Sequence, residues 1–387
     1  MKLDNIKELI EKEEIGAITI DTSVFDAQGL RLESGLLKQL EQFSDSPIEV
    51  ILSEVVKNEI LRHIEEKIKN TYVEVEKALK NAKNYCQLEE ENINNIKASI
   101  FKGKEPKVIA SERLDKFIKI TPVEIVEVQD YVEAGKLLEK YFQSKPPFAK
   151  AGDKKSEFPD AMALMSLESW AEENMTKVLV ISKDNDWKQY CEQCENLIFF
   201  DDFSKAFELF QLPIEPHEIC KQLSQKYRES NLSFIKKAIA ATLQARVCEF
   251  DLYIEAESSY QYEDEVIDID YEKFEFNIIE NPDIIFRPIN YDKDSLVVEA
   301  ELKVEVRIEC GFYFMTWDSI DKEYIGMGAA NLDKKVTLDV DVLVTLVDET
   351  GRFDNNIEVD EVEVITTKET IDFGYIEPDW MSGDDYD

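Results

Sequence analysis

The chain has 387 residues, of which 44% are hydrophobic, and a formal net charge of −38. This length predicts two domains, and the hydrophobic content with few glycines and prolines excludes a disordered chain. No apolar segment is long enough to span a bilayer, and the charged N-terminus has no signal-peptide pattern, so we expect a cytoplasmic protein with no membrane partner. The negative field repels nucleic acid at long range, so a nucleic-acid enzyme with this charge needs metal ions and a local basic patch.

The cysteines and histidines narrow the chemistry further. The six cysteines form no disulfide framework, which indicates reduced thiols. Cys191 and Cys194 form a C-x-x-C, but no second pair or neighbouring histidine completes a zinc site, so we expect buried or half-exposed thiols on a helix. His63 and His217 are the only histidines, which excludes a His-rich metal site and argues against His-dependent acid–base catalysis.

The first predicted elements alternate between helix and strand. A charged helix is expected over residues 1–14, and the β-branched apolar segment 15–20 predicts a buried strand that Asp21 follows directly. Helical periodicity covers residues 30–43, and a second strand is expected over 48–52. Ser53 is then the expected N-cap of the next helix.

The next part is expected to be mostly helical. Residues 54 to about 102 contain no Pro or Gly and predict one or two long helices, part of a helical insertion at about 65–145. Helices over 109–120 and 131–142 flank a short strand within 120–128. Residues 143–157 contain two prolines and a glycine and are typical of a loop.

A regular α/β pattern then completes the first half. Pro159 and Asp160 open a helix, and strands at 178–182 and 197–200 alternate with helices at 184–194 and 203–210. This order predicts an α/β fold with a doubly wound, mainly parallel sheet. The pattern changes at residue 212, so we expect domains at 1–212 and 213–387.

The second half has the pattern of half-buried antiparallel strands. A helical stretch over 218–248 precedes strict period-two alternation at 298–310 and 336–346, with shorter examples at 250–254 and 274–278. The alternation slips by one residue between Val359 and Val362, which predicts a bulge or two separate strands. We expect an α+β domain, either a sandwich or a sheet with a helix packed on it, and a mobile acidic tail after residue 378.

Carboxylates recur at the predicted strand ends and helix starts of the first half, which meet at one edge of a parallel sheet. Because like charges repel unless a cation lies among them, an acidic cluster there predicts one or two divalent ions, and oxygen ligands favour Mg²⁺ or Mn²⁺. Glu59 is preferred over Glu54, since an acid in the first helical turn is explained by the helix dipole. The expected ligands are Asp21, Glu59, Asp160 and Asp184, with Asp186 as a further ligand or the cap of the next helix.

Other polar residues near these carboxylates are candidates for substrate contacts. Ser23 and Ser182 offer hydroxyls, and His63 lies one helical turn after Glu59. A local basic segment before Asp160 is either a solvated loop or a phosphate-binding flap, with Lys145, Lys154 and Lys155 as its expected contacts. No phosphate-loop, dinucleotide or serine-hydrolase motif is present.

These motifs together resemble those of PIN domains, over about residues 15–212. The resemblance rests on Ile20-Asp21-Thr22-Ser23, Ser53…Glu59, Phe158-Pro159-Asp160-Ala161 and Ile181-Ser182-Lys183-Asp184. It implies a parallel sheet whose acidic quartet, here Asp21, Glu59, Asp160 and Asp184, binds Mg²⁺ or Mn²⁺ and cuts RNA. Glu59–His63, Lys145–Phe148 and Glu157–Ala161 further resemble a bacterial subgroup of PIN-like proteins. The helical stretch and the β-rich half depart from compact PIN domains.

The sequence thus predicts a metal-dependent endoribonuclease, with a defence or toxin-like role suggested by family analogy alone. Two alternatives stay open. A structure-specific DNA nuclease would use the helical insertion as an arch, although that stretch lacks dense Lys and Arg. A non-catalytic protein whose acidic surface binds a basic partner would explain the net charge. The β-rich half is expected to bind a protein partner, mediate self-association or restrain the nuclease.

Overall fold

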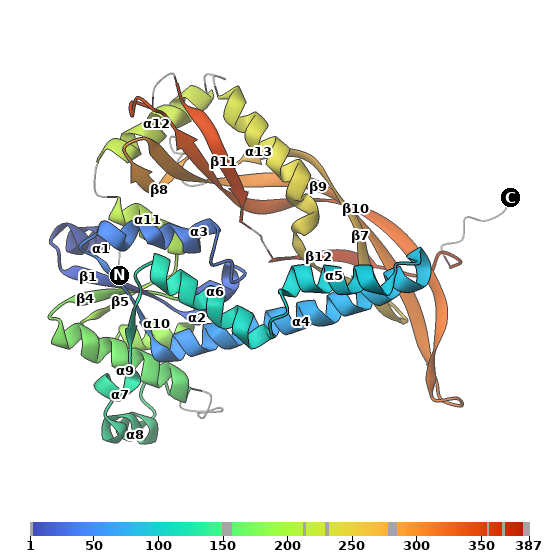
Figure 1. The fold of residues 1–387 in the computed structure, drawn as a ribbon, viewed down its shortest axis with the longest axis horizontal. Helices are drawn as coiled ribbons and strands as arrows, with labels where there is room; N and C mark the ends of the chain where they lie inside the picture. The colour runs from blue at the N-terminus through green and yellow to red at the C-terminus, as the bar shows by residue number, and fades with distance from the viewer. Residues whose placement is uncertain are drawn as a thin grey trace. The chain divides into compact units, whose positions relative to one another are not determined.

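The structure is a computed structural model, and it divides the chain into two compact units, Met1–Leu212 (unit 1) and Pro213–Asp387 (unit 2). We describe each unit by itself (Figure 1). The residues described are 3–148, 157–211, 214–228, 232–277, 285–353, 356–365 and 368–381. Within these ranges, no helix combines the length and the apolar character needed to cross a bilayer.

Unit 1 is built on a parallel sheet, as the alternation of strands and helices predicted. In spatial order the strands are β3 (Glu124–Val126), β2 (Glu49–Ser53), β1 (Ile15–Ile20), β4 (Lys177–Ile181) and β5 (Leu197–Phe200). The central strands are almost wholly buried because helices cover both faces. The chain winds outward in opposite directions from β1 and β4, which makes the carboxyl ends of these strands the topological switch point.

Helices of unit 1 cover the two faces of this sheet (Figure 1). One face carries α1 (Leu3–Glu11), α3 (Gly35–Lys38) and α11 (Phe203–Phe210), and the other carries α9 (Phe158–Glu173). Two short helices begin at the carboxyl ends of the central strands, α2 (Thr22–Ala27) after β1 and α10 (Asn185–Cys191) after β4. The single helix expected over 30–43 is instead α3 followed by a 3₁₀ helix, η1 (Gln39–Asp45).

Long helices project from the sheet as an arm. Ser53 caps α4 (Glu54–Cys86) as predicted, accepting a hydrogen bond from the Val55 N–H at 3.4 Å. The arm is completed by α5 (Glu90–Phe101) and α6 (Pro106–Ile120), which pack on α4 (Figure 1). The short strand expected within 120–128 is β3, which joins the sheet before α7 (Val128–Tyr131) and α8 (Ala134–Gln143).

Unit 2 contains a twisted antiparallel sheet with two helices on one face. Its strands are β11 (Glu358–Val364), β10 (Glu323–Val347), β9 (Ser295–Asp318) and β7 (Gln261–Phe276), and β8 (Arg287–Asp292) also pairs with β9. Alternate β9 residues pack with α12 (Ile214–Arg228) and α13 (Ser233–Arg246) in one apolar core. A sheet with helices on it was therefore the right alternative to a sandwich. The predicted slip near Val359 is a bulge.

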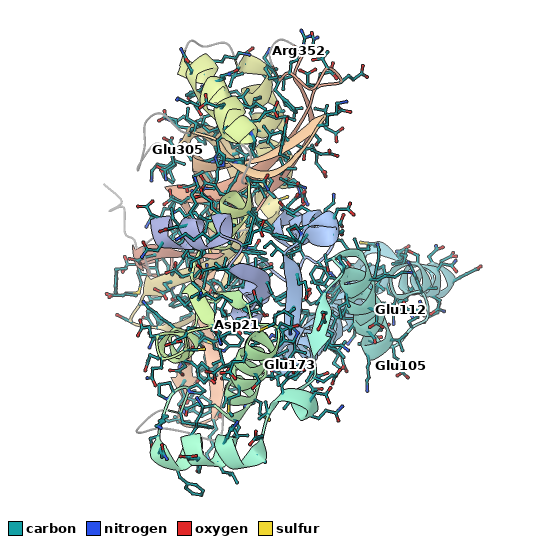
Figure 2. The ribbon with its side chains drawn as sticks, turned by 90° about the vertical axis from the view of Figure 1, so that its left-hand side faces the viewer. Asp21, Glu105, Glu112, Glu173, Glu305 and Arg352 are labelled. Atoms are coloured by element: carbon teal, nitrogen blue, oxygen red, sulfur yellow. The ribbon has the colours of Figure 1, made fainter. Side chains whose placement is uncertain are left out.

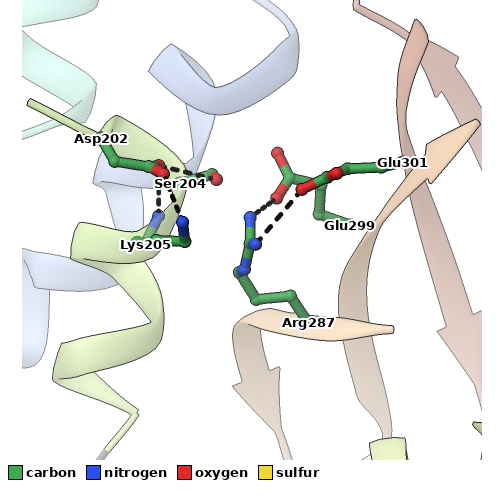
Figure 3. Close-up of polar contacts among 6 residues, drawn as sticks. All are labelled: Asp202, Ser204, Lys205, Arg287, Glu299 and Glu301. Carbon is green, nitrogen blue, oxygen red and sulfur yellow. Dashed lines mark hydrogen bonds and ion pairs between the residues drawn. The ribbon is translucent and has the colours of Figure 1, made fainter. Parts of the chain in front are cut away.

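Two features of unit 2 were not expected. β6 (Asp251–Glu257) pairs in parallel with β12 (Lys368–Tyr375), because alternation predicts a half-buried strand without specifying the direction of its partner. Glu299 is buried on β9 and is neutralised by Arg287, which also reaches Glu301 (Figure 3). Of the predicted mobile tail, residues 382–387 lie outside the described residues.

Candidate functional site

Asp21 lies at the switch point of the parallel sheet. Its backbone N–H donates to the Ile181 carbonyl at 2.9 Å, so the residue continues the pairing of β1 with β4. The side chain is 5% exposed and accepts hydrogen bonds from the Ser23 hydroxyl at 2.5 Å and the Ser182 hydroxyl at 2.9 Å. Burial raises the pKa of Asp21, and these two hydroxyls act in the opposite direction. Figure 2 shows Asp21 among the strands and helices of unit 1, whereas Glu105 and Glu112 project from the arm.

Ser182 connects two of the expected ligands. It is fully buried directly after β4, donates to Asp21 and accepts a hydrogen bond from the Asp184 N–H at 2.9 Å. A hydroxyl that contacts substrate must be exposed, whereas the Ser182 hydroxyl is buried. Its hydrogen bonds instead support Asp21 and Asp184. Ser23 is half-buried, donates to Asp21 and accepts from the Lys183 N–H at 3.3 Å.

The capping of α10 reverses the predicted assignment. Asp184 is the N-cap, and its side chain accepts a hydrogen bond from the Asp186 N–H at 2.6 Å. Asp186 lies in the first turn of the helix and not at the cap. Burial raises the pKa of Asp186, and the negative charge of Asp184 adds to the shift. Asp184 therefore holds the start of α10 as well as presenting a carboxylate near Asp21.

Glu59 faces the same region from α4, and Glu54 does not. The Thr22 hydroxyl, at the start of α2, donates to Glu59 at 2.7 Å. Glu54 accepts a hydrogen bond from the Val128 N–H at 3.0 Å, at the start of α7. The different partners support the choice of Glu59 over Glu54. The contact between Thr22 and Glu59 was not predicted from the sequence, because the two residues lie 37 positions apart in the chain.

His63 has partners that were not predicted. Its Nδ1 lies 2.9 Å from an Asp26 carboxylate oxygen, and its Nε2 lies 2.8 Å from an Arg62 nitrogen. The imidazole is therefore held between α2 and α4, one turn after Glu59. These contacts leave a quarter of the side chain exposed, at 25%.

Asp160 is the third residue of α9, inside the helix and not at its cap, which is Glu157. The buried Trp187 indole N–H donates to it at 2.9 Å. Burial is the largest cause that raises the pKa of Asp160, to about 6, while the Trp187 hydrogen bond lowers it. Three negative charges add to the rise, those of Glu59, Asp21 and Asp184. The expected quartet is thus electrostatically coupled at Asp160.

Trp187 is a neighbour of the proposed site that was not identified from the sequence. It is buried, at 1% exposure, and its position in α10 lets the indole N–H reach α9. A buried indole N–H needs a hydrogen-bond partner, which was the available signal. The sequence does not predict which residue accepts this hydrogen bond, since Asp160 is 27 residues away in the chain.

The chemistry of these carboxylates suits a divalent cation, but the distances between them in this structure do not form a metal site. Oxygen ligands from separate elements, with repulsion focused on Asp160, are the donor set that Mg²⁺ or Mn²⁺ would neutralise. Within the described ranges, however, no three His, Cys, Asp or Glu side chains lie close enough together to hold one ion.

An aromatic cluster joins the predicted flap to α9. Phe148 packs on Tyr141 and Phe158, with ring centroids 5.4 and 5.0 Å apart. Phe158 begins α9, two residues before Asp160, so the segment after α8 is tied to the helix that carries this carboxylate. Lys145 is exposed, while the expected contacts Lys154 and Lys155 lie outside the described residues.

The C-x-x-C thiols are protonated and structural in character. Burial raises the pKa of Cys191 to about 12, and also raises that of Cys194, to about 11. Thiols with such values are poor nucleophiles and poor metal ligands at neutral pH. The expectation of buried or half-exposed thiols is confirmed, but only Cys191 lies on a helix, because α10 ends there and Cys194 follows it.

Comparison with known proteins agrees with this geometry. The family model described as PIN domain matches residues 18–187, which include Asp21, Glu59, Asp160 and Asp184. No curated protein and no solved structure matches the chain. PIN domains form a family of nucleases that typically bind divalent metals. Residues 18–187 of this chain are therefore a PIN domain.

Proposed function

We propose that this chain is a divalent-metal-dependent endoribonuclease, with Asp21, Glu59, Asp160 and Asp184 as its catalytic carboxylates. The observation that carries the proposal is the state of Asp160, whose pKa is raised to about 6 by burial and further by the negative charges of Glu59, Asp21 and Asp184. A carboxylate cluster of this kind costs free energy unless a cation binds it. Mg²⁺ or Mn²⁺, when bound, would ionise the attacking water and neutralise charge on the phosphate.

Neighbouring residues would orient these carboxylates. Ser182 donates to the Asp21 carboxylate and accepts from the Asp184 backbone N–H, while Thr22 donates to Glu59 and Trp187 donates to Asp160. Such donors fix the orientation of a carboxylate, and their loss commonly lowers metal affinity by roughly 10- to 100-fold. Asp186 is proposed as an accessory ligand from the first turn of α10.

Substrate binding would use groups at the rim of the site. Lys145 is exposed after α8, and with Lys154 and Lys155 it is proposed to contact phosphates. Ser23 and His63 are further candidates, since both are partly exposed beside Asp21 and Glu59. Ser182 is not proposed to contact substrate, because its hydroxyl is buried.

The arm argues for RNA over a threaded DNA strand. Four of its lysines are held in ion pairs with neighbouring carboxylates, which are Lys69–Glu65, Lys83–Glu90, Lys97–Glu76 and Lys104–Glu112. A DNA-threading arch needs unpaired cations along its length. A role in defence or growth arrest rests on family resemblance alone.

The decisive experiment is cleavage of a mixed pool of labelled RNA and single-stranded DNA with Mn²⁺, Mg²⁺ or EDTA. We expect metal-dependent cutting of RNA that Glu59→Gln abolishes. Glu54→Gln is the matched control, because it changes a carboxylate at the start of the same helix whose partner is Val128. No cutting by the wild-type chain under any condition would favour the non-catalytic acidic protein, and cutting of DNA alone would favour the structure-specific nuclease.

A further inference from the structure

The exposed face of the unit 2 sheet changes character along β9. Near the helices, the side chains on this face form ion pairs across the strands. Lys303 pairs with Asp339 at 3.0 Å, Lys273 pairs with Glu305 at 2.8 Å, and Arg307 pairs with Asp270. Cations and carboxylates pair across the strands there, as is typical of a solvated sheet surface.

Beyond Gly311 the same face becomes aromatic. Tyr313, Met315 and Trp317 alternate along β9, and Tyr324 of β10 lies opposite Trp317. Tyr313, Trp317 and Tyr324 are 47%, 53% and 51% exposed, and the rings of Trp317 and Tyr324 meet edge to face at 5.0 Å. We call these four residues the aromatic tip. The opposite face already has its own core of Phe312 and Phe314, so packing within the unit does not explain the tip.

The tip is hollowed at its edge with β7. A shallow cavity of about 570 Å³, widely open to solvent, is lined by Tyr260, Gln261, Tyr262, Glu263, Met315 and Tyr324. The Tyr262 hydroxyl is held by hydrogen bonds to the Ala256 backbone N–H and carbonyl, both at 2.9 Å. The volume of the cavity is large enough for a long side chain to lie in it.

The charge beside the tip is negative and unbalanced. Glu263 and Glu265 of β7 lie on the same face as the tip, opposite Tyr313 and Gly311 of β9, and within the described part of the chain no ion pair joins either carboxylate to a Lys or Arg. Nucleic acid is repelled by such a surface, and a second copy of the chain would bring the same carboxylates to the contact. A cationic group would gain ion pairs with the carboxylates and cation–π contacts with the exposed rings.

We infer that the aromatic tip and the adjoining carboxylates of β7 form a docking site for a Lys- or Arg-rich segment of a partner protein. One cationic side chain would enter the cavity beside Glu263, and the flanking chain would lie over Tyr313, Trp317 and Tyr324. This assigns unit 2 the recognition of a basic polypeptide, independently of the chemistry of unit 1. Both the aromatic rings and the carboxylates are needed, because either alone gives weak binding in water.

The test is fluorescence anisotropy of a labelled oligoarginine peptide titrated with the full-length chain. We expect saturable binding that weakens at least about tenfold in the double variant Trp317→Ala/Tyr324→Ala and also weakens in Glu263→Gln. Tyr253→Ala is the matched control, since Tyr253 is an equally exposed strand tyrosine of unit 2, at 52%. Circular dichroism verifies that each variant keeps its fold.

Three results would overturn the inference. Wild-type chain that does not bind the peptide has no such site. Equal binding by the double variant and the control would mean that the peptide responds to overall charge. Sedimentation that shows a dimer lost only in the double variant would make the tip a contact between copies of this chain.

Discussion

The two units use acidic residues in opposite ways. In unit 1 a few carboxylates gather at the covered end of a parallel sheet, where burial and mutual repulsion raise the pKa of Asp160 to about 6. In unit 2 carboxylates alternate along exposed strands, where Lys and Arg pair with them. Arg307, for example, has its pKa raised by the hydrogen bond to Asp270. The pKa of an acidic residue therefore depends on its burial and its charged neighbours, and not on how many acidic residues the unit contains.

The largest expected difference between the two units is the effect on activity of removing one carboxylate from each. We expect Asp21→Asn to lower the rate of Mn²⁺-dependent RNA cleavage by more than about 100-fold, because a ligand matters more than the residues that orient it. Glu305→Gln, which removes a carboxylate paired with Lys273 on the exposed sheet, should leave the rate unchanged. Equal loss in both variants would mean that general charge controls activity.

A smaller effect is expected from the donors that orient the carboxylates. Trp187→Phe keeps a buried ring and removes the N–H that reaches Asp160. We expect Mn²⁺ affinity, measured by calorimetry, to fall by about 10- to 100-fold. Trp170→Phe is the control, because its indole N–H donates to Glu124 and not to the proposed site. An unchanged affinity in Trp187→Phe would remove Trp187 from the site.

The raised pKa of Asp160 predicts how stability depends on pH without metal. The pKa of this carboxyl is about 6 in the native state, above its usual value of 3.8, so between these pH values the native state keeps a proton that the unfolded state has lost. The stabilisation that this proton gives to the native state is present near pH 4 and is lost as pH rises through 6. At pH 7 the ionised, partly exposed group then costs about 1–2 kcal/mol.

Asp160→Asn should therefore stabilise unit 1 in EDTA at pH 7 by that amount, and by less at pH 5. Urea unfolding followed by tryptophan emission measures this, since Trp170 and Trp187 are both buried in unit 1. Saturating Mn²⁺ should reverse the order and favour the wild-type chain. A variant that is less stable than the wild type in EDTA at pH 7 would contradict the assigned cause.

The smallest expected effect concerns the core below the site. The Thr19 hydroxyl on β1 is buried and has no hydrogen-bond partner among the described residues. Thr19→Val replaces it with a methyl group of similar size, which should stabilise unit 1 by about 1 kcal/mol. Ser182→Ala is the contrasting variant and should destabilise, because that hydroxyl donates to Asp21. Loss of stability in Thr19→Val would indicate a partner for the hydroxyl, such as a bound water.

Much of the architecture was predictable from local pattern. The bounds of β1 and β5 agree with the apolar segments, Ser53 caps α4, and the alternation over 298–310 identifies β9. Asp21 and Asp184 were placed correctly because a residue that directly follows a strand must lie at the strand's end. The cap of α10 was misassigned by two residues, since Asp184 and Asp186 have equal capping propensity and only the backbone path separates them.

The sequence by itself determined which segments become helix or strand and which carboxylates stand at strand ends, because these depend on residues a few positions apart. The tertiary structure alone decided the parallel pairing of β6 with β12, the donation from Trp187 to Asp160, and the pKa of that carboxyl. Burial and charge repulsion sum over neighbours that are distant in the chain, so no local pattern contains them.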